Sequence, residues 1–108
     1  MATIDDFSKL EFRIGTVTSA ELVPETDKLV RLTVDLGEEE KRQIISGIRE
    51  YIDSPEDLVG KQFPFVSNLE PRTIKGLESN GMIFAIGKGE TFAFLNPSKE
   101  IPAGTKLG

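Results

Sequence analysis

The chain has 108 residues, 38% of them hydrophobic and 29% charged, and a formal net charge of −5 at neutral pH. A chain of this size buries one modest core, so we expect residues 1–108 to form a single domain. The sequence contains no cysteine and no histidine, which excludes disulfides, thiolate zinc sites and every mechanism that needs an imidazole base.

Other classes of function find no support in the composition. No glycine-rich nucleotide-binding motif is present, and the acidic residues cluster in stretches typical of turns and helix starts. We therefore expect no catalytic site, no metal site and no cofactor. No stretch of about eighteen apolar residues exists, and the N-terminal residues lack a secretory signal pattern. These features predict a cytoplasmic protein with no membrane partner.

The N-terminal part of the chain predicts one short helix and one long strand. Residues 4–10 favour a helix, because two aspartates stand where a helix N-terminus stabilises negative charge. Residues 10–23 alternate between apolar and other side chains until Pro24 ends the pattern. Gly15 interrupts this alternation, which predicts a bulge or a strong bend in the first strand.

Two further strands follow at short intervals. Residues 29–37 alternate cleanly, with the apolar side chains on one face and Arg31, Thr33 and Asp35 on the other. Residues 41–47 come directly after an acidic turn and predict the third strand.

The second half of the chain begins with a helix signal and a fourth strand. Ser54 and Pro55 predict the N-cap and first position of a short helix over residues 54–60. Residues 62–68 predict the fourth strand, in which Pro64 indicates a sheet edge or a bulge.

The C-terminal third predicts a fifth strand over residues 81–87, a possible sixth over 91–97 and an irregular tail over 99–108. This order of elements favours an all-β fold, a five-stranded Greek-key barrel of the OB type. A short helix lies between strands three and four, and extensions flank the barrel at both ends. Other small barrels remain an alternative.

Cations are few but fall next to predicted loops. Lys28 opens the second strand, Arg42 opens the third, and Arg72 and Lys75 lie in a loop rich in turn formers at residues 68–81. In an OB barrel the loops after strands one and four flank one face. We therefore expect these four cations to converge on one groove, where the local field attracts phosphate although the net charge is negative. The alternative is that each cation is a solubilising surface charge.

Four segments, in this order and spacing, resemble the tRNA-binding domain family. They are DFSKLEFRIGTV, PETDKLVRLTVDLGEEEKRQIISGI, VSNLEPRTIKGLESNGMIFA and NPSKEIPAGTKL. The family includes the C-terminal appendage of methionyl-tRNA synthetases, stand-alone tRNA-binding proteins and the module of endothelial-monocyte-activating polypeptide. The resemblance covers about residues 6–107 and implies a non-catalytic OB domain that binds tRNA by shape and raises a synthetase's affinity for it.

The resemblance, together with the pattern of cations, assigns residues to two surfaces. The tRNA-binding residues are Lys28, Arg31, Arg42, Ser46, Gly47, Asn68, Arg72, Lys75, Ser79 and Met82. The resemblance also implies a homodimer formed by the chain ends, with Ile4, Phe7, Ile101, Pro102 and Leu107 at the interface. The alternative for these five is packing on their own barrel. The implied partners are tRNA, a second copy and an aminoacyl-tRNA synthetase catalytic chain.

Two other readings have less support. A secretion-chaperone-like relative of the same fold would bind unfolded peptides, but that group departs in the DKLVRL and SGI segments that this chain keeps. An oligosaccharide-binding barrel would need exposed aromatic platforms, whereas the chain has no tryptophan and one tyrosine.

Overall fold

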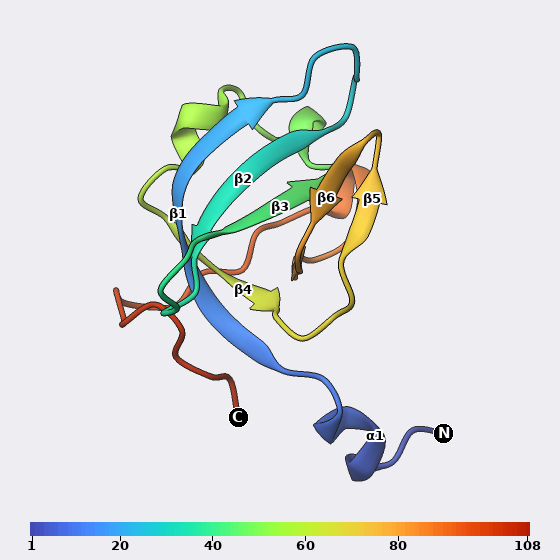
Figure 1. The fold of residues 1–108 in the computed structure, drawn as a ribbon, viewed down its shortest axis with the longest axis vertical. Coiled ribbons are helices and arrows are strands. Elements are labelled where there is room, and N and C mark those ends of the chain that lie inside the picture. Colours follow the sequence, from blue (N-terminus) through green and yellow to red (C-terminus); the bar gives the residue numbers. More distant parts are fainter.

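The computed structural model describes residues 1–108 and shows a small barrel with a helix standing off one end (Figure 1). The barrel strands are β1 (Phe12–Leu22), β2 (Val30–Asp35), β3 (Arg42–Ser46), β4 (Gln62–Val66) and β7 (Met82–Ile83). A two-stranded hairpin, β5 (Arg72–Ile74) and β6 (Leu77–Ser79), lies beside β3. The helical elements are α1 (Ile4–Ser8) and the 3₁₀-helices η1 (Arg49–Tyr51), η2 (Pro55–Leu58) and η3 (Gly89–Thr91).

The five barrel strands form one antiparallel sheet in the order β3-β2-β1-β4-β7. The two outer strands approach each other, because the amide of Asn80, just before β7, donates to the carbonyl of Gln43 in β3 at 2.8 Å. The sheet thereby curls into a nearly closed barrel, and the predicted five-stranded OB fold is confirmed. No helix has the length and apolar character required to cross a membrane.

The barrel interior follows the predicted alternation in β2. Val30, Leu32 and Val34 are fully buried, and the residues between them face outward. Phe63 and Phe65 of β4 fill the opposite side of the core. This apolar interior is the main source of stability for a chain without disulfides.

Of the two alternatives expected for Gly15, a bulge or a strong bend, the bulge does not form at this residue, whereas β1 does curve strongly along its length (Figure 1). Gly15 pairs regularly with Phe63 in β4, and the register of β1 against β2 shifts instead between Val17 and Ser19. Gly15 is required for packing, because a β-carbon there would lie 2.5 Å from Cγ1 of Val34. The interruption in the sequence pattern therefore marks close packing across the barrel.

The predicted helices are confirmed with shorter lengths. Thr3 caps α1, with its hydroxyl accepting from the amide of Asp6. The hydroxyl of Ser54 accepts from the amide of Glu56 at 3.4 Å, and Pro55 opens η2 as predicted, although the element is a single 3₁₀ turn.

The C-terminal strands differ most from the prediction. Strand β7 has two residues, and the predicted sixth strand over 91–97 is wrong, since only an isolated bridge joins Ile86 to Ala93. The aromatic residues that suggested a strand pack inward: Phe92 stacks on Tyr51 at 3.8 Å and Phe94 lies 5.1 Å from Phe63. The alternation reflects packing of Phe92 and Phe94 against the core, without a paired strand beside them.

Pro64 lies in an interior strand and explains why β7 is so short. Its carbonyl accepts from the amide of Phe84 at 2.9 Å, but proline has no N–H to return. Pairing between β4 and β7 therefore ends at this position. The expectation that Pro64 marks a sheet edge or a bulge is wrong, because β4 lies between β1 and β7. The missing N–H of Pro64 does, however, limit the length of the pairing with β7.

Candidate nucleic-acid interface

The segment expected to be a stiff exposed loop is a tight β-hairpin. Ile74 pairs with Leu77, and the two residues between them, Lys75 and Gly76, have φ angles of 50° and 81°. Two successive positive φ angles define the two-residue turn that suits the twist of a hairpin. Lys75 therefore lies at the tip of a short, rigid ribbon.

Strand β6 is attached to β3 through side chains. The side-chain amide of Gln43 donates to the carbonyl of Glu78 at 2.9 Å, and the hydroxyl of Ser79 accepts from the backbone amide of Ile45 at 2.9 Å. The hydroxyl of Ser79 also donates to the carbonyl of Gly81, and Ser79 is only 3% exposed. Ser79, predicted to contact tRNA, is a buried link that holds the hairpin on the barrel.

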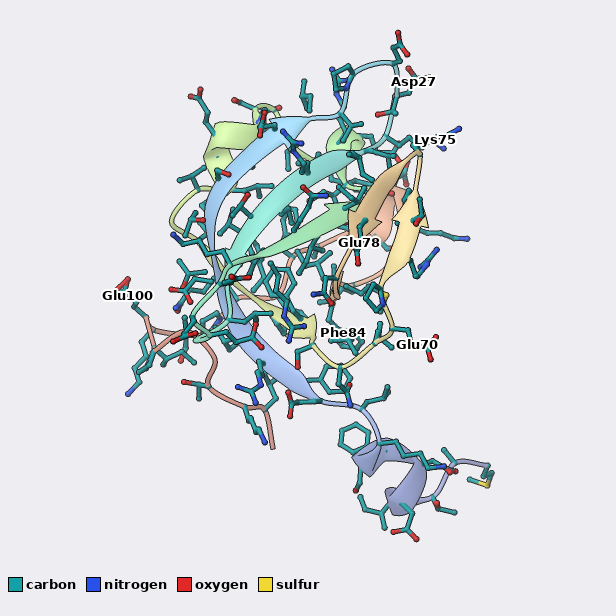
Figure 2. The ribbon with its side chains drawn as sticks, in the orientation of Figure 1. Asp27, Glu70, Lys75, Glu78, Phe84 and Glu100 are labelled. Carbon is teal, nitrogen blue, oxygen red and sulfur yellow. The ribbon has the colours of Figure 1, made fainter.

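Three of the predicted cations have free side chains. Arg72, Lys75 and Lys28 are exposed, and none forms an ion pair. Lys28 and Lys75 line the same groove, between the β1–β2 loop and the hairpin tip. Figure 2 shows this arrangement, with Asp27 and Lys75 at the ends of the two projecting loops.

Other predicted residues lie on the outer faces of the neighbouring strands. Ser46, at the end of β3, is opposite Val30, and the exposed Gly47 follows it with open space around its α-carbon. Arg31 faces outward from β2 but is bound to Glu21 at 2.7 Å. Met82 is exposed in β7. Their assignment to tRNA binding stays a prediction.

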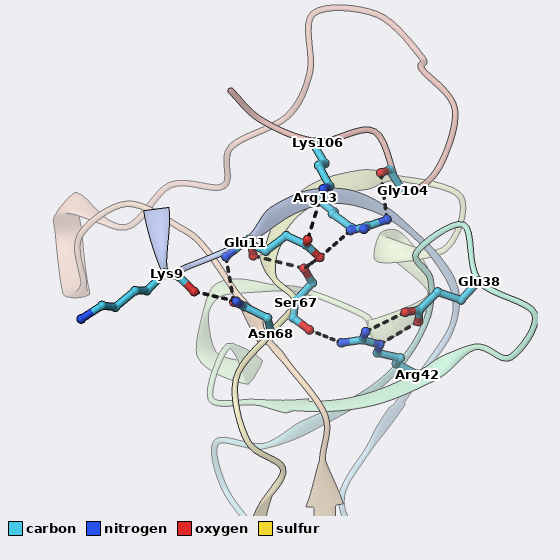
Figure 3. A network of polar contacts seen from close by, with 9 residues as sticks. All are labelled: Lys9, Glu11, Arg13, Glu38, Arg42, Ser67, Asn68, Gly104 and Lys106. Atoms are coloured by element: carbon cyan, nitrogen blue, oxygen red, sulfur yellow. Dashed lines mark hydrogen bonds and ion pairs between the residues drawn. The ribbon is translucent and has the colours of Figure 1, made fainter. Parts of the chain in front are cut away.

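Arg42 does not join the groove. It pairs with Val34 at the other end of β3, and its guanidinium binds both carboxylate oxygens of Glu38, at 2.8 and 2.7 Å. The third nitrogen donates to the carbonyl of Ser67, just after β4 (Figure 3). The hydrogen bonds from Arg42 hold the pKa of Glu38 below its ordinary value. The expected convergence of four cations is therefore wrong for Arg42.

Asn68 is also engaged within the chain. Its side-chain oxygen accepts from the amide of Glu11 at 2.7 Å, and its side-chain nitrogen donates to the carbonyl of Lys9 at 2.7 Å. It thus fixes the segment that joins α1 to β1. A role in contacting tRNA would require Asn68 to give up these partners.

Glu11 is the centre of the same network (Figure 3). Its carboxylate accepts from Arg13 at 2.7 Å and from Ser67 at 2.9 Å, and Lys106 lies 3.4 Å away. The hydrogen bonds from Arg13 and Ser67 lower the pKa of Glu11 to about 2. The hydrogen bond from Glu11 in turn raises the pKa of Arg13. This cluster ties both chain ends to the turn that leads into the hairpin.

The terminal apolar residues divide into two groups. Ile4 and Phe7 are 75% and 57% exposed, and Phe7 stacks on Phe12, which contacts Phe84 edge-on. Ile101 instead packs on its own barrel, where Gln62 binds both its amide and its carbonyl.

The remaining two predicted interface residues lie in the exposed C-terminal tail. Pro102 and Leu107 are both exposed, and the amide of Leu107 donates to the carbonyl of Phe12 at 3.0 Å.

Five further residues line the groove beside Lys28 and Lys75 and are not predicted from the sequence. They are Glu25, Thr26, Asp27, Leu29 and Ile74. The turn-forming residues 24–27 predicted the position of the loop. Nothing local in the sequence shows which distant segment this loop faces.

A nearly closed five-stranded barrel with free cations on the loops that flank one end defines an oligonucleotide-binding type of protein. Comparison with known proteins is consistent with this class. Residues 12–106 match the model of the family described as "Putative tRNA binding domain". The chain belongs to this family.

The curated relatives are methionine–tRNA ligases. The chain is 48% identical over 106 residues to that of Methanococcoides burtonii and 50% identical over 105 residues to that of Thermotoga maritima. Each match covers 97% of this chain but only 15% or 16% of the relative. The chain therefore spans about one sixth of the length of these enzymes.

Two solved structures match over nearly their full lengths. A methionyl-tRNA-synthetase-related protein from Pyrococcus horikoshii is 36% identical with a TM-score of 0.90, covering 100% of this chain and 98% of its own. The chaperone CsaA from Bacillus anthracis is also 36% identical, with a TM-score of 0.87 and coverage of 100% and 99%.

The Glu11 cluster predicts a specific dependence of stability on pH. Because the pKa of Glu11 is about 2 in the folded chain and lies near 4.5 ordinarily, its contribution to the free energy of unfolding is present above about pH 5. It is lost as the pH falls from 5 toward 2. In urea unfolding, the Glu11→Gln variant should be less stable at pH 7 and show a shallower decline below pH 5. Glu90→Gln, an exposed carboxylate without a partner, should decline like the parent, and an equal slope for Glu11→Gln would contradict this account.

The role of Arg42 can be decided by changing its partner. If Arg42 contacts phosphate, Glu38→Gln frees the guanidinium, removes a negative charge and strengthens RNA binding. If Arg42 positions the Ser67 turn, as its three hydrogen bonds indicate, the same change weakens RNA binding by a few-fold. We expect the weakening, measured by fluorescence anisotropy with tRNA. Glu39→Gln removes an equal charge from the same turn and serves as the control.

Proposed function

We propose that this domain binds tRNA through the loops at one end of the barrel. The observation that carries the proposal is the rigid hairpin with Arg72 and Lys75 exposed and unpaired, next to Lys28 on the facing loop. Phosphate contacts from cations on rigid elements give affinity without reading sequence. The similarity to the tRNA-binding family and to ligases that act on tRNA supports the same nucleic acid.

In this proposal the domain is an accessory of tRNA charging and has no catalysis of its own. Its relatives carry the corresponding region as a small part of a methionine–tRNA ligase, so a synthetase catalytic chain is the natural partner, fused or separate. A linked tRNA-binding module raises the effective concentration of tRNA at the active site. The cytoplasmic location stays a prediction.

A second function, binding of unfolded peptides, is favoured by two observations. The similarity to the chaperone CsaA covers the whole chain, and the structure exposes apolar residues on α1 and at Phe84. Such a patch is also the expected surface of a protein–protein contact. Binding assays with tRNA and with an unfolded peptide in the same buffer separate the two functions.

Arg72→Ala/Lys75→Ala tests the tRNA proposal. The parent should bind total tRNA with an affinity that falls as salt rises, because counterions are released from the phosphates. Loss of two phosphate contacts should reduce the slope of log K against log salt by roughly 1.4 to 1.8, and weaken binding about tenfold or more at low salt. The measurement is fluorescence anisotropy across a salt series.

The matched control is Lys61→Ala/Lys99→Ala, which removes the same charge from exposed residues of another surface. It should retain most of the affinity and the slope. Equal losses in both double variants would mean that binding follows net charge alone, and no binding of tRNA by the parent would refute the proposal.

We further propose that two copies of this chain associate through their N-terminal helices. The support is the run of contacts from Phe7 to Phe12 to Phe84, at 5.9 and 5.2 Å, which leaves an apolar face around α1 partly exposed. A second copy with the same face would cover it by two-fold symmetry. Of the residues predicted for this interface, Ile4 and Phe7 are the ones most available.

Ile4→Ser/Phe7→Ser should convert the dimer into a monomer in sedimentation velocity experiments at micromolar concentration. Ile4 and Phe7 are large apolar side chains exposed on α1, so their replacement removes apolar area that the proposed contact would bury. Val59→Ser, which changes an exposed apolar residue elsewhere, should leave the dimer intact. A parent chain that sediments as a monomer would refute the dimer.

A further inference from the structure

The groove between the β1–β2 loop and the hairpin tip has a composition that phosphate binding alone does not explain. Residues 25–29 form one wall, and Ile74 and Lys75 form the other, around a cavity of about 410 Å³. Two basic residues, Lys28 and Lys75, line this groove together with two acidic residues, Glu25 and Asp27. A surface built only for phosphates would not place carboxylates there, because they repel the ligand.

The four charged side chains do not neutralise one another. None of Glu25, Asp27, Lys28 and Lys75 forms an ion pair or a side-chain hydrogen bond, although all line one groove. All four are exposed at its rim. Half-buried Leu29 and Ile74 supply the apolar part of the lining. The groove thus combines apolar walls with unpaired donors and acceptors, as ligand sites do.

The backbone of both walls is held in an unusual conformation. Glu25 and Lys75, with φ angles of 63° and 50°, are the only two residues other than glycine with positive φ in this structure. At the position of Lys75, asparagine would fit the hairpin turn with less strain. Such strained positions collect at functional sites, and here the two face each other across the groove.

We propose that this groove holds one unstacked base of the bound RNA and that the base is guanine. The proposal rests on the tRNA function above and adds the identity of one base that the groove binds. Lys28 and Lys75 bind the phosphates on either side of the base, and Leu29 and Ile74 contact its faces. Bases splayed out of a folded RNA are the ones that proteins read by their Watson–Crick edges.

Guanine follows from the chemistry of the acceptors. An ionised carboxylate can only accept hydrogen bonds. Guanine offers two adjacent donors on its Watson–Crick edge, N1–H and the N2 amino group, which together match the two oxygens of one carboxylate. Adenine and cytosine offer one amino donor next to an acceptor, and uracil offers one N–H between two carbonyls. Asp27 and Glu25 therefore favour guanine over the other three bases.

The test uses the intact chain and four labelled RNA pentanucleotides. Each has two uridines on both sides of a central nucleotide, whose base is guanine, adenine, cytosine or uracil. Fluorescence anisotropy at low salt should show at least about tenfold tighter binding of the guanine pentanucleotide than of the uracil one, the effect of one bidentate contact. The Glu25→Gln/Asp27→Asn variant should lose this preference. Its affinity for the all-uridine strand should stay equal or rise, because two negative charges are removed.

Glu100→Gln is the control, since Figure 2 shows Glu100 at the opposite side of the barrel from Asp27 and Lys75. It should keep the guanine preference. Thermal melting of each variant checks the fold, which the double substitution in the groove should not alter because Glu25 and Asp27 have no partners.

Three results would overturn the proposal: no guanine preference in the parent, no binding of any pentanucleotide, or tighter guanine binding by the double variant. Total tRNA is titrated in parallel with the parent. If tRNA binds while the guanine preference is absent, the groove proposal fails and the tRNA function stands. If tRNA does not bind, the function itself fails.

Discussion

The hydrogen bond from the amide of Ile45 to the hydroxyl of Ser79 is the interaction on which the arrangement of this molecule depends. It joins β3 to the end of the hairpin, at a place where the barrel would otherwise have an open edge. Both groups are buried, so the loss of either partner would leave an unsatisfied polar group inside the protein. Because the hairpin is held here, Lys75 faces the β1–β2 loop and a groove forms between them. The cationic end of the barrel is thus a consequence of how the barrel closes.

A second set of polar contacts works at the opposite end. The Glu11 cluster and Asn68 bind the N-terminal segment, the C-terminal tail and the turn after β4 to one another. The carbonyl of Ser67 accepts a hydrogen bond from Arg42, and its hydroxyl donates to the carboxylate of Glu11. The start of the segment that leads into the hairpin is therefore fixed by two partners. One end of this rigid body carries the proposed RNA surface, and the other carries the exposed helix α1 (Figure 1). In a dimer through α1 the two RNA surfaces would therefore remain free.

The sequence predicted those features that local rules determine. Alternation placed Val30, Leu32 and Val34 in the core, and the Ser54–Pro55 pair predicted the start of η2. It did not predict the roles of Arg42, Asn68 and Ser79, whose partners lie 25, 57 and 34 residues away. Each reads as an exposed polar residue next to a turn, and only the closed barrel shows that it is engaged.

The wrong sixth strand has a similar cause, since aromatic residues that alternate along 92–94 suit a strand and a mouth of a barrel equally. Only part of the candidate site was predicted, because the sequence does not show which distant segments face each other. Arg72 and Lys75 stood out because turn formers surround them, whereas Glu25 and Asp27 gained significance only when the hairpin proved to face them.

Mapping of the tRNA-binding surface by NMR tests the central claim most directly. Backbone amide shifts of the isotope-labelled chain would be followed as tRNA is added. We expect the largest changes in residues 25–29 of the β1–β2 loop and in residues 72–78 of the hairpin. Changes centred on α1, or around Lys61 and Lys99, with the hairpin unaffected, would contradict it.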